Sequence, residues 1–119
     1  MSSKPRIDVD TFSKLEVKVG TVRTAERVPD TDKLLRLTVD FGEVGEDGVP
    51  VPRQIVSGIA AYVSDPASLV GRQLAFVTNL EPRVIRGLES NGMLFAVGEG
   101  DSFAFLTSDR PVPPGTAAH

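Results

Sequence analysis

Three polar clusters in this chain carry the side chains best suited to chemistry, and each interrupts a run of apolar residues. The clusters span residues 30–33, 53–58 and 79–93. Their candidate binding residues are Lys33, Arg53, Ser57, Asn79, Arg83, Ser90 and Met93. The cations could neutralise phosphates, and a guanidinium could also stack on a base. The amide and hydroxyl groups could read base edges or ribose hydroxyls, and the methionine could pack against an exposed base.

Each of these residues also has a structural interpretation when it is taken singly. The Ser-Gly and Ser-Asn-Gly runs are ordinary turn formers. Lys33 directly follows Asp32, as in many solvated turns, and Met93 could belong to the core because it opens an apolar run. The argument for a binding site therefore rests on the clusters as a group.

The chain lacks the residues of most enzyme active sites. It has no Cys, which excludes thiol catalysis, disulfides and Cys-bound zinc. Its one His is His119, the last residue, so no His general base, Ser–His pair or His metal site is expected within the fold. A small carboxylate enzyme stays open as an alternative, although most acidic residues stand singly in turns or alternate along strands. We predict a protein that catalyses nothing and uses no metal or cofactor.

Charge is unevenly distributed along the sequence. The formal net charge is −3, the opposite sign from a simple nucleic-acid binder. Residues 37–52 contain four acidic groups and no Lys or Arg, whereas residues 53–87 contain four Arg and two acidic groups. A basic face is therefore compatible with an acidic protein, although charge alone favours an ordinary mixed-charge surface.

Alternation of apolar and polar residues predicts mainly β-strands. The first strand begins at Leu15–Val19 and resumes at Val22, with a bulge or bend predicted at Gly20, where the phase of the alternation changes. The other predicted strands are residues 35–41, 53–57, 73–78 and 93–97, with a short added strand at 103–107.

The segments between the strands carry turn and helix signals. Residues 42–52 are rich in Gly, Pro and acids and predict a solvated hairpin loop. Asp65, Pro66 and Gly71 are typical of the N-cap, the first position and the end of a helix, here of one to two turns. The prolines near the chain end exclude regular structure there; they are Pro111, Pro113 and Pro114.

The order of these elements indicates the fold. Five strands with a short helix between the third and fourth strands are the order of an OB-fold, a partly open Greek-key barrel. We therefore predict an all-β, five-stranded OB-fold barrel with extra C-terminal β structure. The 119 residues are expected to form a single domain, 1–119, with a core of about residues 12–107 and a Pro-rich segment at 108–119. OB-folds bind ligands on strands two and three and with the loops joining strands one–two and four–five, where all three polar clusters fall.

Other functional signals are weak. No apolar run approaches the roughly 18 residues of a membrane span, so no membrane partner is expected. The polar start Met1–Pro5 resembles no signal peptide, and a cytoplasmic location is the expectation. Aromatic residues are few, and most of the Phe residues fall at alternating strand positions, which argues against a stacking platform for single strands.

The motifs, taken in order, resemble one known family. They are Phe12, Lys18–Gly20, Asp32–Leu34, Gln54–Ile59, Asn79–Leu80, Pro82–Arg83, Gly87, Glu89–Ser90, Gly92–Met93 and Pro113–Gly115. This pattern is similar to the tRNA-binding domain appended to many methionyl-tRNA synthetases. The same domain occurs in free-standing structure-specific tRNA-binding proteins and in endothelial monocyte-activating polypeptide II. The resemblance covers about residues 7–116, nearly the whole chain.

The resemblance carries several expectations. It implies an OB-fold with extra C-terminal structure that binds tRNA by shape, and it assigns RNA binding to the seven residues named above. It also implies a homodimer, with the N-terminal segment and the C-terminal third as the interface. An aminoacyl-tRNA synthetase is a further expected partner.

A related branch is the alternative. Proteins of the CsaA type, chaperones linked to protein export, resemble this chain at Phe12–Gly20 and at Pro113–Gly115. They typically lack the Ser-Gly-Ile and Ser-Asn-Gly-Met runs found here. Binding of unfolded polypeptides is therefore the second hypothesis for the function.

Overall fold

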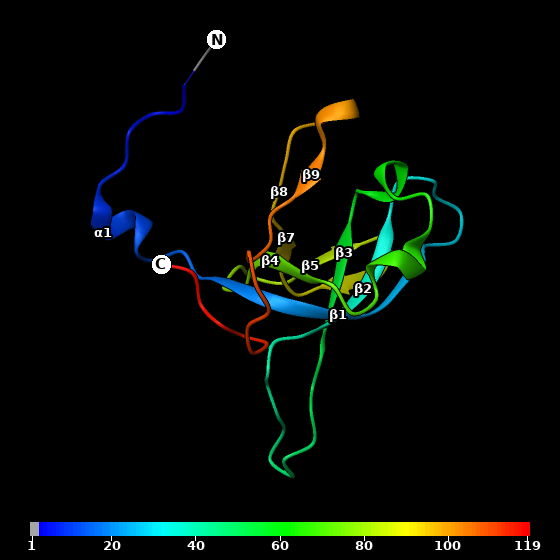
Figure 1. The fold of residues 1–119 in the computed structure, drawn as a ribbon, viewed down its shortest axis with the longest axis horizontal. Coiled ribbons are helices and arrows are strands. Elements are labelled where there is room, and N and C mark those ends of the chain that lie inside the picture. Colours follow the sequence, from blue (N-terminus) through cyan, green and yellow to red (C-terminus); the bar gives the residue numbers. More distant parts are fainter. Residues whose placement is uncertain (1–2) are drawn as a thin grey trace.

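The computed structural model describes residues 3–119, which form a nearly closed β-barrel (Figure 1). Its main sheet is antiparallel and has the order β3-β2-β1-β4-β7. The strands of this sheet are β1 (Val17–Arg27), β2 (Leu35–Asp40), β3 (Arg53–Ser57), β4 (Gln73–Val77) and β7 (Met93–Leu94). The predicted OB-like barrel is confirmed, because the long first strand pairs with both β2 and β4.

Strand β1 changes partner halfway along its length. Its first half pairs with β4 as far as Thr21, and its second half pairs with β2. The sequence predicted a bulge at Gly20. The pairing register instead shifts between Val22 and Thr24, so the bulge lies after Gly20. A Cβ atom at Gly20 would overlap the side chains of Val39 and Phe41. Gly20 therefore permits close packing of the barrel wall.

The core is built from alternating residues of the central strands. The fully buried side chains include Leu35, Leu37 and Val39 of β2, Ile55 of β3, and Leu74 and Phe76 of β4. Period-two alternation places these residues on the inner face of the sheet and their neighbours on the outer face. The Phe76 ring also meets the ring of Phe41 edge-on, with 5.4 Å between centroids.

The predicted helix is a single 3-10 turn, η2 (Pro66–Leu69), and η1 (Ala60–Tyr62) precedes it. The Asp65 carboxylate accepts a hydrogen bond from the Ala67 N–H at 3.1 Å, as its predicted N-cap role requires. A four-residue segment accommodates no second turn. A short helix that the sequence analysis did not predict, α1 (Val9–Phe12), precedes the barrel.

The predicted fifth strand is split into two pieces. After β7 the chain continues as β8 (Ala96–Val97), which leaves the main sheet and pairs with β9 (Ala104–Phe105). These two strands supply the extra C-terminal β structure, joined through the 3-10 turn η3 (Gly100–Ser102). The β9 strand is shorter than the predicted 103–107.

The connection from β4 to β7 contains a hairpin that the sequence analysis missed. Its strands are β5 (Arg83–Ile85) and β6 (Leu88–Ser90). Arg86 and Gly87 form the two-residue turn, with φ values of 52° and 77°. Positive φ at both positions is the geometry of the tight hairpin turn, which usually has Asn or Asp at the first of them. Because Arg86 occupies the first position, no sequence signal indicated this turn.

Residues 42–52 project from the barrel as a narrow hairpin arm, as the sequence analysis expected of a solvated loop (Figure 1). Its two sides meet through the Gly45 N–H, which bonds to the Val49 carbonyl at 2.9 Å, and through an isolated bridge between Val44 and Pro50. We call residues 42–52 the acidic hairpin.

The end of the C-terminal segment, residues 108–119, runs along β1, and we call this segment the C-terminal strap. The Gly115 N–H bonds to the Val19 carbonyl at 2.7 Å, and the Ala118 N–H bonds to the Val17 carbonyl at 2.8 Å. Apart from one isolated bridge at Ala117, the strap has no regular secondary structure, as its prolines predicted. Within residues 3–119, no helix has the length and apolar character to cross a membrane.

Candidate functional site

The outer face of β2 is polar, and β3 adds Gln54 and the buried Val56 to this face. Because Leu35, Leu37 and Val39 point inward, the residues between them face outward. Cross-strand register pairs Arg36 with Val56 on this face. The β5–β6 hairpin packs beside it, because the Asn91 N–H bonds to the Gln54 carbonyl at 2.8 Å.

A groove lined by arginines runs between the end of the β1–β2 pair and the tip of the β5–β6 hairpin. We call it the arginine groove, and its lining residues are Glu26, Arg27, Val28, Pro29, Arg36, Arg86 and Leu88. Three guanidinium groups and one carboxylate give this lining a positive charge. Guanidinium groups bind phosphate through paired N–H donors, so the groove suits an anionic ligand.

The three arginines are held differently. The Arg27 guanidinium donates to the carbonyls of Val63 and Ser64 at 3.1 and 3.2 Å. Arg36 forms an ion pair with Glu26 on the neighbouring strand. Arg86 is exposed at the hairpin tip and forms no ion pair within the described part of the chain. Arg86 is therefore the guanidinium most accessible to a ligand.

A second hollow next to this groove brings three of the predicted residues together. Arg83, Ser90 and Met93 line it, along with Val56 of β3 and the exposed carboxylate of Glu81. Arg83 is exposed, and the Met93 side chain is 47% exposed, so Met93 does not belong to the core. A cation beside an exposed thioether fits the predicted contact with a phosphate and its base.

Ser90 has a structural role in the same hollow. It is buried, and its Oγ accepts a hydrogen bond from the Val56 N–H at 3.0 Å. The hydroxyl also donates to the Gly92 carbonyl at 3.2 Å. These bonds join the β5–β6 hairpin to the free edge of β3 and so help to close the barrel. The Ser90 hydroxyl is already engaged within the protein.

Asn79 is engaged in the same way at the end of β4. Its Oδ1 accepts a hydrogen bond from the Glu16 N–H at 2.9 Å, and its Nδ2 donates to the Lys14 carbonyl at 2.6 Å. The Asn79 side chain therefore holds in place the segment that leads into β1. Thr78 supports the same segment, since its hydroxyl donates to the Glu16 carboxylate at 2.7 Å and lowers the pKa of that group.

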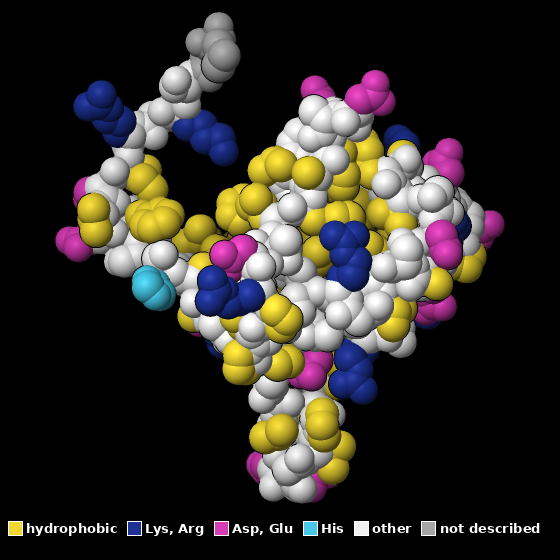
Figure 2. Space-filling model, viewed as in Figure 1, with side chains coloured by type: hydrophobic (Ala, Val, Ile, Leu, Met, Phe, Trp, Pro, Cys, Tyr) yellow, Lys and Arg dark blue, Asp and Glu magenta, His cyan; other side chains and the backbone are white. Residues whose placement is uncertain are grey.

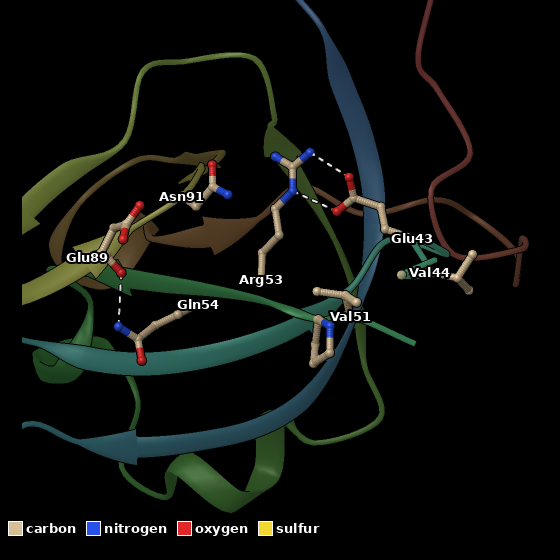
Figure 3. A pocket seen from close by; sticks show the side chains of 9 residues that line it. Glu43, Val44, Val51, Arg53, Gln54, Glu89 and Asn91 are labelled. Carbon is tan, nitrogen blue, oxygen red and sulfur yellow. Dashed lines mark hydrogen bonds and ion pairs between the residues drawn. The ribbon is translucent and has the colours of Figure 1, made fainter. Parts of the chain in front are cut away.

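Arg53 lies at the base of the acidic hairpin, where its guanidinium is paired with Glu43 (Figure 3). Its Nε and Nη2 donate to the two carboxylate oxygens at 2.7 and 2.9 Å, and its Nη1 donates to the Thr78 carbonyl at 2.7 Å. The guanidinium also lies 5.4 Å from the centroid of the Phe41 ring. Hydrogen bonding to Arg53 lowers the pKa of Glu43, and the same bonding raises the pKa of Arg53.

The hollow around Arg53 differs from the arginine groove in charge. Glu43, Glu89 and Asn91 line it together with Arg53, and Figure 3 shows all four side chains around the same space. Two carboxylates against one guanidinium make it unfavourable for phosphate. Gln54, also in its lining, donates from Nε2 to the Glu89 carbonyl at 2.9 Å.

Lys33 and Ser57 lie together at the other end of β3. Ser57 pairs with Leu35, directly after the loop that contains Lys33. The Lys33 carbonyl accepts a hydrogen bond from the Ala60 N–H at 3.1 Å, while its side chain is exposed. The predicted residues are thus divided among separate places: Lys33 with Ser57; Arg83 with Ser90 and Met93; Arg53 and Asn79 at the opposite end of the sheet.

Three arginines of the groove were absent from the predicted set. Arg36 could have been found from its outward position in an alternating strand. Arg86 could have been found only with the hairpin turn, because its place depends on the β5–β6 pairing. Arg27 has no such signal, since its place depends on contacts with Val63 and Ser64.

Residues 3–119 contain no group of three or more His, Cys, Asp or Glu side chains arranged to hold a metal ion.

Comparisons with known proteins identify several that are similar to this chain. A family model described as a putative tRNA binding domain matches residues 17–117. A methionine–tRNA ligase from Methanoregula boonei is 49% identical over 112 residues, which are 94% of this chain and 15% of the ligase. The chain therefore spans a small part of the curated relatives that it matches.

Two solved structures match over nearly their whole length. The crystal structure of a MetRS related protein from Pyrococcus horikoshii has a TM-score of 0.83 and 37% identity, and covers 98% of this chain and 100% of that one. The crystal structure of the chaperone CsaA from Bacillus anthracis str. Ames has a TM-score of 0.77 and 28% identity, and covers 97% of this chain and 100% of that one.

Proposed function

The chain belongs to the family of putative tRNA-binding domains, and from this premise we propose that it binds folded tRNA by shape and catalyses nothing itself. The whole of residues 1–119 acts as one binding domain. Its ligand is the phosphate backbone of a folded RNA, which explains a site made of separated cations and few base-reading groups.

The arginine groove is the observation that carries this proposal. Arg27, Arg36 and Arg86 come from three segments of the chain and line one hollow, with Glu26 as the only carboxylate in its lining. Arg83 of β5 and Met93 of β7 line the adjoining hollow, in which Glu81 is the one carboxylate. A cationic track of this kind follows a backbone without selecting a sequence.

The seven residues expected from the sequence have different roles in this proposal. Lys33, Arg83 and Met93 are exposed and contact the RNA, with Ser57 beside Lys33. Arg53, Asn79 and Ser90 act as positioning residues, because their polar atoms already bond to the protein.

The similarity to methionine–tRNA ligases suggests the setting. The domain increases the affinity of a synthetase for tRNA, either as part of the same chain or as a separate protein that associates with the enzyme. Its place is then the cytoplasm, in protein biosynthesis. Methionylation is the activity of the whole ligase, of which this chain matches 15%.

The chain acts as a homodimer in this proposal. The N-terminal arm, residues 3–16, carries apolar side chains in the open, with Ile7 64%, Val9 79% and Phe12 61% exposed. Helix α1 buries none of its residues, and a four-residue helix has too few hydrogen bonds to be stable alone in water. Figure 2 shows hydrophobic side chains on this arm and on the neighbouring face of the barrel. A second copy is the occupant that fits both surfaces.

Titration with two RNAs tests the function. Binding to a tRNA transcript and to an unstructured RNA of equal length is measured at two salt concentrations. The proposal predicts tighter binding to the tRNA and a loss of affinity as salt rises, because phosphate contacts release counterions. Equal binding to both RNAs, or binding to neither, would contradict it.

Binding of unfolded polypeptides is the second candidate function. The observation in its favour is the similarity to the chaperone CsaA, together with the exposed apolar arm. Suppression of the aggregation of an unfolded client, without binding to tRNA, would favour this function. A protein that binds tRNA and leaves client aggregation unchanged would exclude it.

A further inference from the structure

A group of aromatic rings crosses the surface between η1 and the β8–β9 ribbon. The ring of Tyr62 stacks on that of Phe103, with 4.2 Å between centroids and 1° between planes. Phe103 meets Phe105 edge-on at 5.1 Å, and the Arg72 guanidinium lies 5.2 Å from the Phe105 ring. The sequence argued against a stacking platform, because aromatic residues are few and most Phe residues fall at alternating strand positions. The contact between Tyr62 and Phe103, which are distant along the chain, forms only in the folded structure.

The Tyr62 ring is only partly used by this packing. It remains 41% exposed, and Phe103 is half-buried. A hollow beside the pair is lined by both rings, by Ala61 and Gly100, and by the Asp101 carboxylate. An aromatic surface and a hydrogen-bond acceptor are thus presented together to solvent.

The aromatic pair adjoins the proposed RNA surface on two sides. Ala60, at the start of η1, donates its N–H to the Lys33 carbonyl at 3.1 Å. Arg27, which lines the arginine groove, bonds to the carbonyls of Val63 and Ser64 directly after Tyr62. A polynucleotide that follows the groove past Arg27 therefore reaches the segment that carries Tyr62.

From this arrangement we infer that Tyr62 and Phe103 form a stacking subsite for one unpaired base of the bound tRNA. This inference rests on the proposed function. The π-face of a base stacks on an aromatic ring whatever its identity, so the subsite adds affinity for an unpaired nucleotide. The Asp101 carboxylate accepts a hydrogen bond from an exocyclic amino group, as acidic side chains do from cytosine. Bases with an amino group are therefore preferred over uracil.

The test compares two RNAs and two Tyr62 variants. Dissociation constants are measured for a tRNA transcript and for a blunt RNA duplex without unpaired bases. Tyr62→Ala is expected to weaken tRNA binding by about 5- to 100-fold and to leave duplex binding unchanged. Tyr62→Phe keeps the ring and is expected to bind tRNA as the unaltered protein does. Val49→Ala, on the acidic hairpin and 55% exposed, is the matched control.

Folding is monitored separately, because Tyr62 also holds the ribbon. Tyr62→Leu keeps an apolar contact with Phe103 but no aromatic face, so a folded Tyr62→Leu protein with weakened tRNA binding supports the subsite. Unchanged tRNA binding by Tyr62→Ala, or an equal loss on the duplex, overturns it. If Arg86→Ala weakens tRNA binding and Tyr62→Ala does not, only the subsite fails. If the unaltered protein does not prefer tRNA to unstructured RNA, the proposed function fails as well.

Discussion

Arginine side chains in this protein fall into two groups that the sequence does not distinguish. Arg53 and Arg36 are paired with Glu43 and Glu26, residues from other segments. Arg83 and Arg86 are exposed on the β5–β6 hairpin and form no ion pair within residues 3–119. Only the tertiary structure shows which guanidinium groups are available to a ligand, so residue type predicted the chemistry of the site but not its members.

Arg86 is the residue at which the phosphate contact is most directly tested. Arg86→Ala should weaken tRNA binding by about 1.5–3 kcal/mol, the usual value for a hydrogen bond to a charged group. It should also reduce the slope of affinity against salt by about one unit, because one phosphate contact is lost. Fluorescence anisotropy at several salt concentrations measures both.

Arg110→Ala is the matched control for this change. Arg110 is also exposed, forms an ion pair with its neighbour Asp109, and lies beside Thr21 and Gln73, away from the arginine groove. The Arg110→Ala variant should bind tRNA with the same slope of affinity against salt as the unaltered protein. The same loss in both variants would indicate a general effect of net charge, and the groove would lose its assigned role.

Substitution of Ser90 distinguishes a structural role of its hydroxyl group from a direct contact with the RNA. Ser90→Ala leaves the buried Val56 N–H without its partner, so the free energy of unfolding should fall by about 1–3 kcal/mol. Urea unfolding measures this change, and tRNA binding well below the unfolding temperature should be unaltered. Ser108→Ala is the control, because the Ser108 hydroxyl is buried without a hydrogen-bond partner in residues 3–119. Lost tRNA binding with unchanged stability would show instead that Ser90 contacts the RNA.

At the level of elements, the alternating pattern predicted the central strands well. The strand predicted at residues 53–57 matches β3. The strands predicted at residues 35–41 and 73–78 are each one residue longer than β2 and β4. These strands bury one face, which imposes period two on the sequence. The β5–β6 hairpin has three residues in each strand and an Arg in its turn, so neither periodicity nor turn composition revealed it.

The acidic hairpin should be stabilised in a pH-dependent way by its ion pair. The pKa of Glu43 lies below its usual value of 4.5, so the carboxylate stabilises the fold above that pH, and the contribution is lost as the pH falls below it. The Glu43 side chain is 38% exposed, and solvent screening limits the effect to about 0.5–1 kcal/mol. Glu43→Gln should therefore lower stability at pH 7 and have little effect near pH 3.

Glu46→Gln provides the control for this pair. Glu46 lies on the same hairpin but forms no ion pair within the described residues. Chemical unfolding at both pH values should show no change for it. An equal loss in both variants, or a Glu43→Gln effect that persists at pH 3, would contradict the assignment.

In the molecule as a whole, the arginine groove and the acidic hairpin place opposite charges on different parts of the surface. The net charge is −3, yet the arginine groove is basic, and the projecting hairpin carries three acidic residues and no Lys or Arg. This separation orients the protein on RNA, since the hairpin is repelled by phosphate. The sequence showed this division only as alternating blocks of charge along the chain.

The exposed arm leads to a prediction about assembly. The protein should be a homodimer in solution, and Phe12→Asp should make it a monomer, because a carboxylate cannot be buried in an apolar interface without a partner. Light scattering after size-exclusion chromatography measures the mass. Val49→Asp, on the acidic hairpin, should leave the dimer intact. A monomeric unaltered protein, or a dimeric Phe12→Asp variant, would exclude the arm as the interface.

We propose that folded tRNA binds to the face formed by β2, β3 and the β5–β6 hairpin. Titration of the isotopically labelled protein with a tRNA transcript, followed through its backbone amide NMR signals, tests this most directly. The largest shifts are expected at Arg27, Arg36, Arg83, Arg86 and Met93, while the signals of Glu46 and Asp47 on the acidic hairpin should remain unchanged. Shifts concentrated on the acidic hairpin or on the N-terminal arm, or no shifts at all, would contradict it.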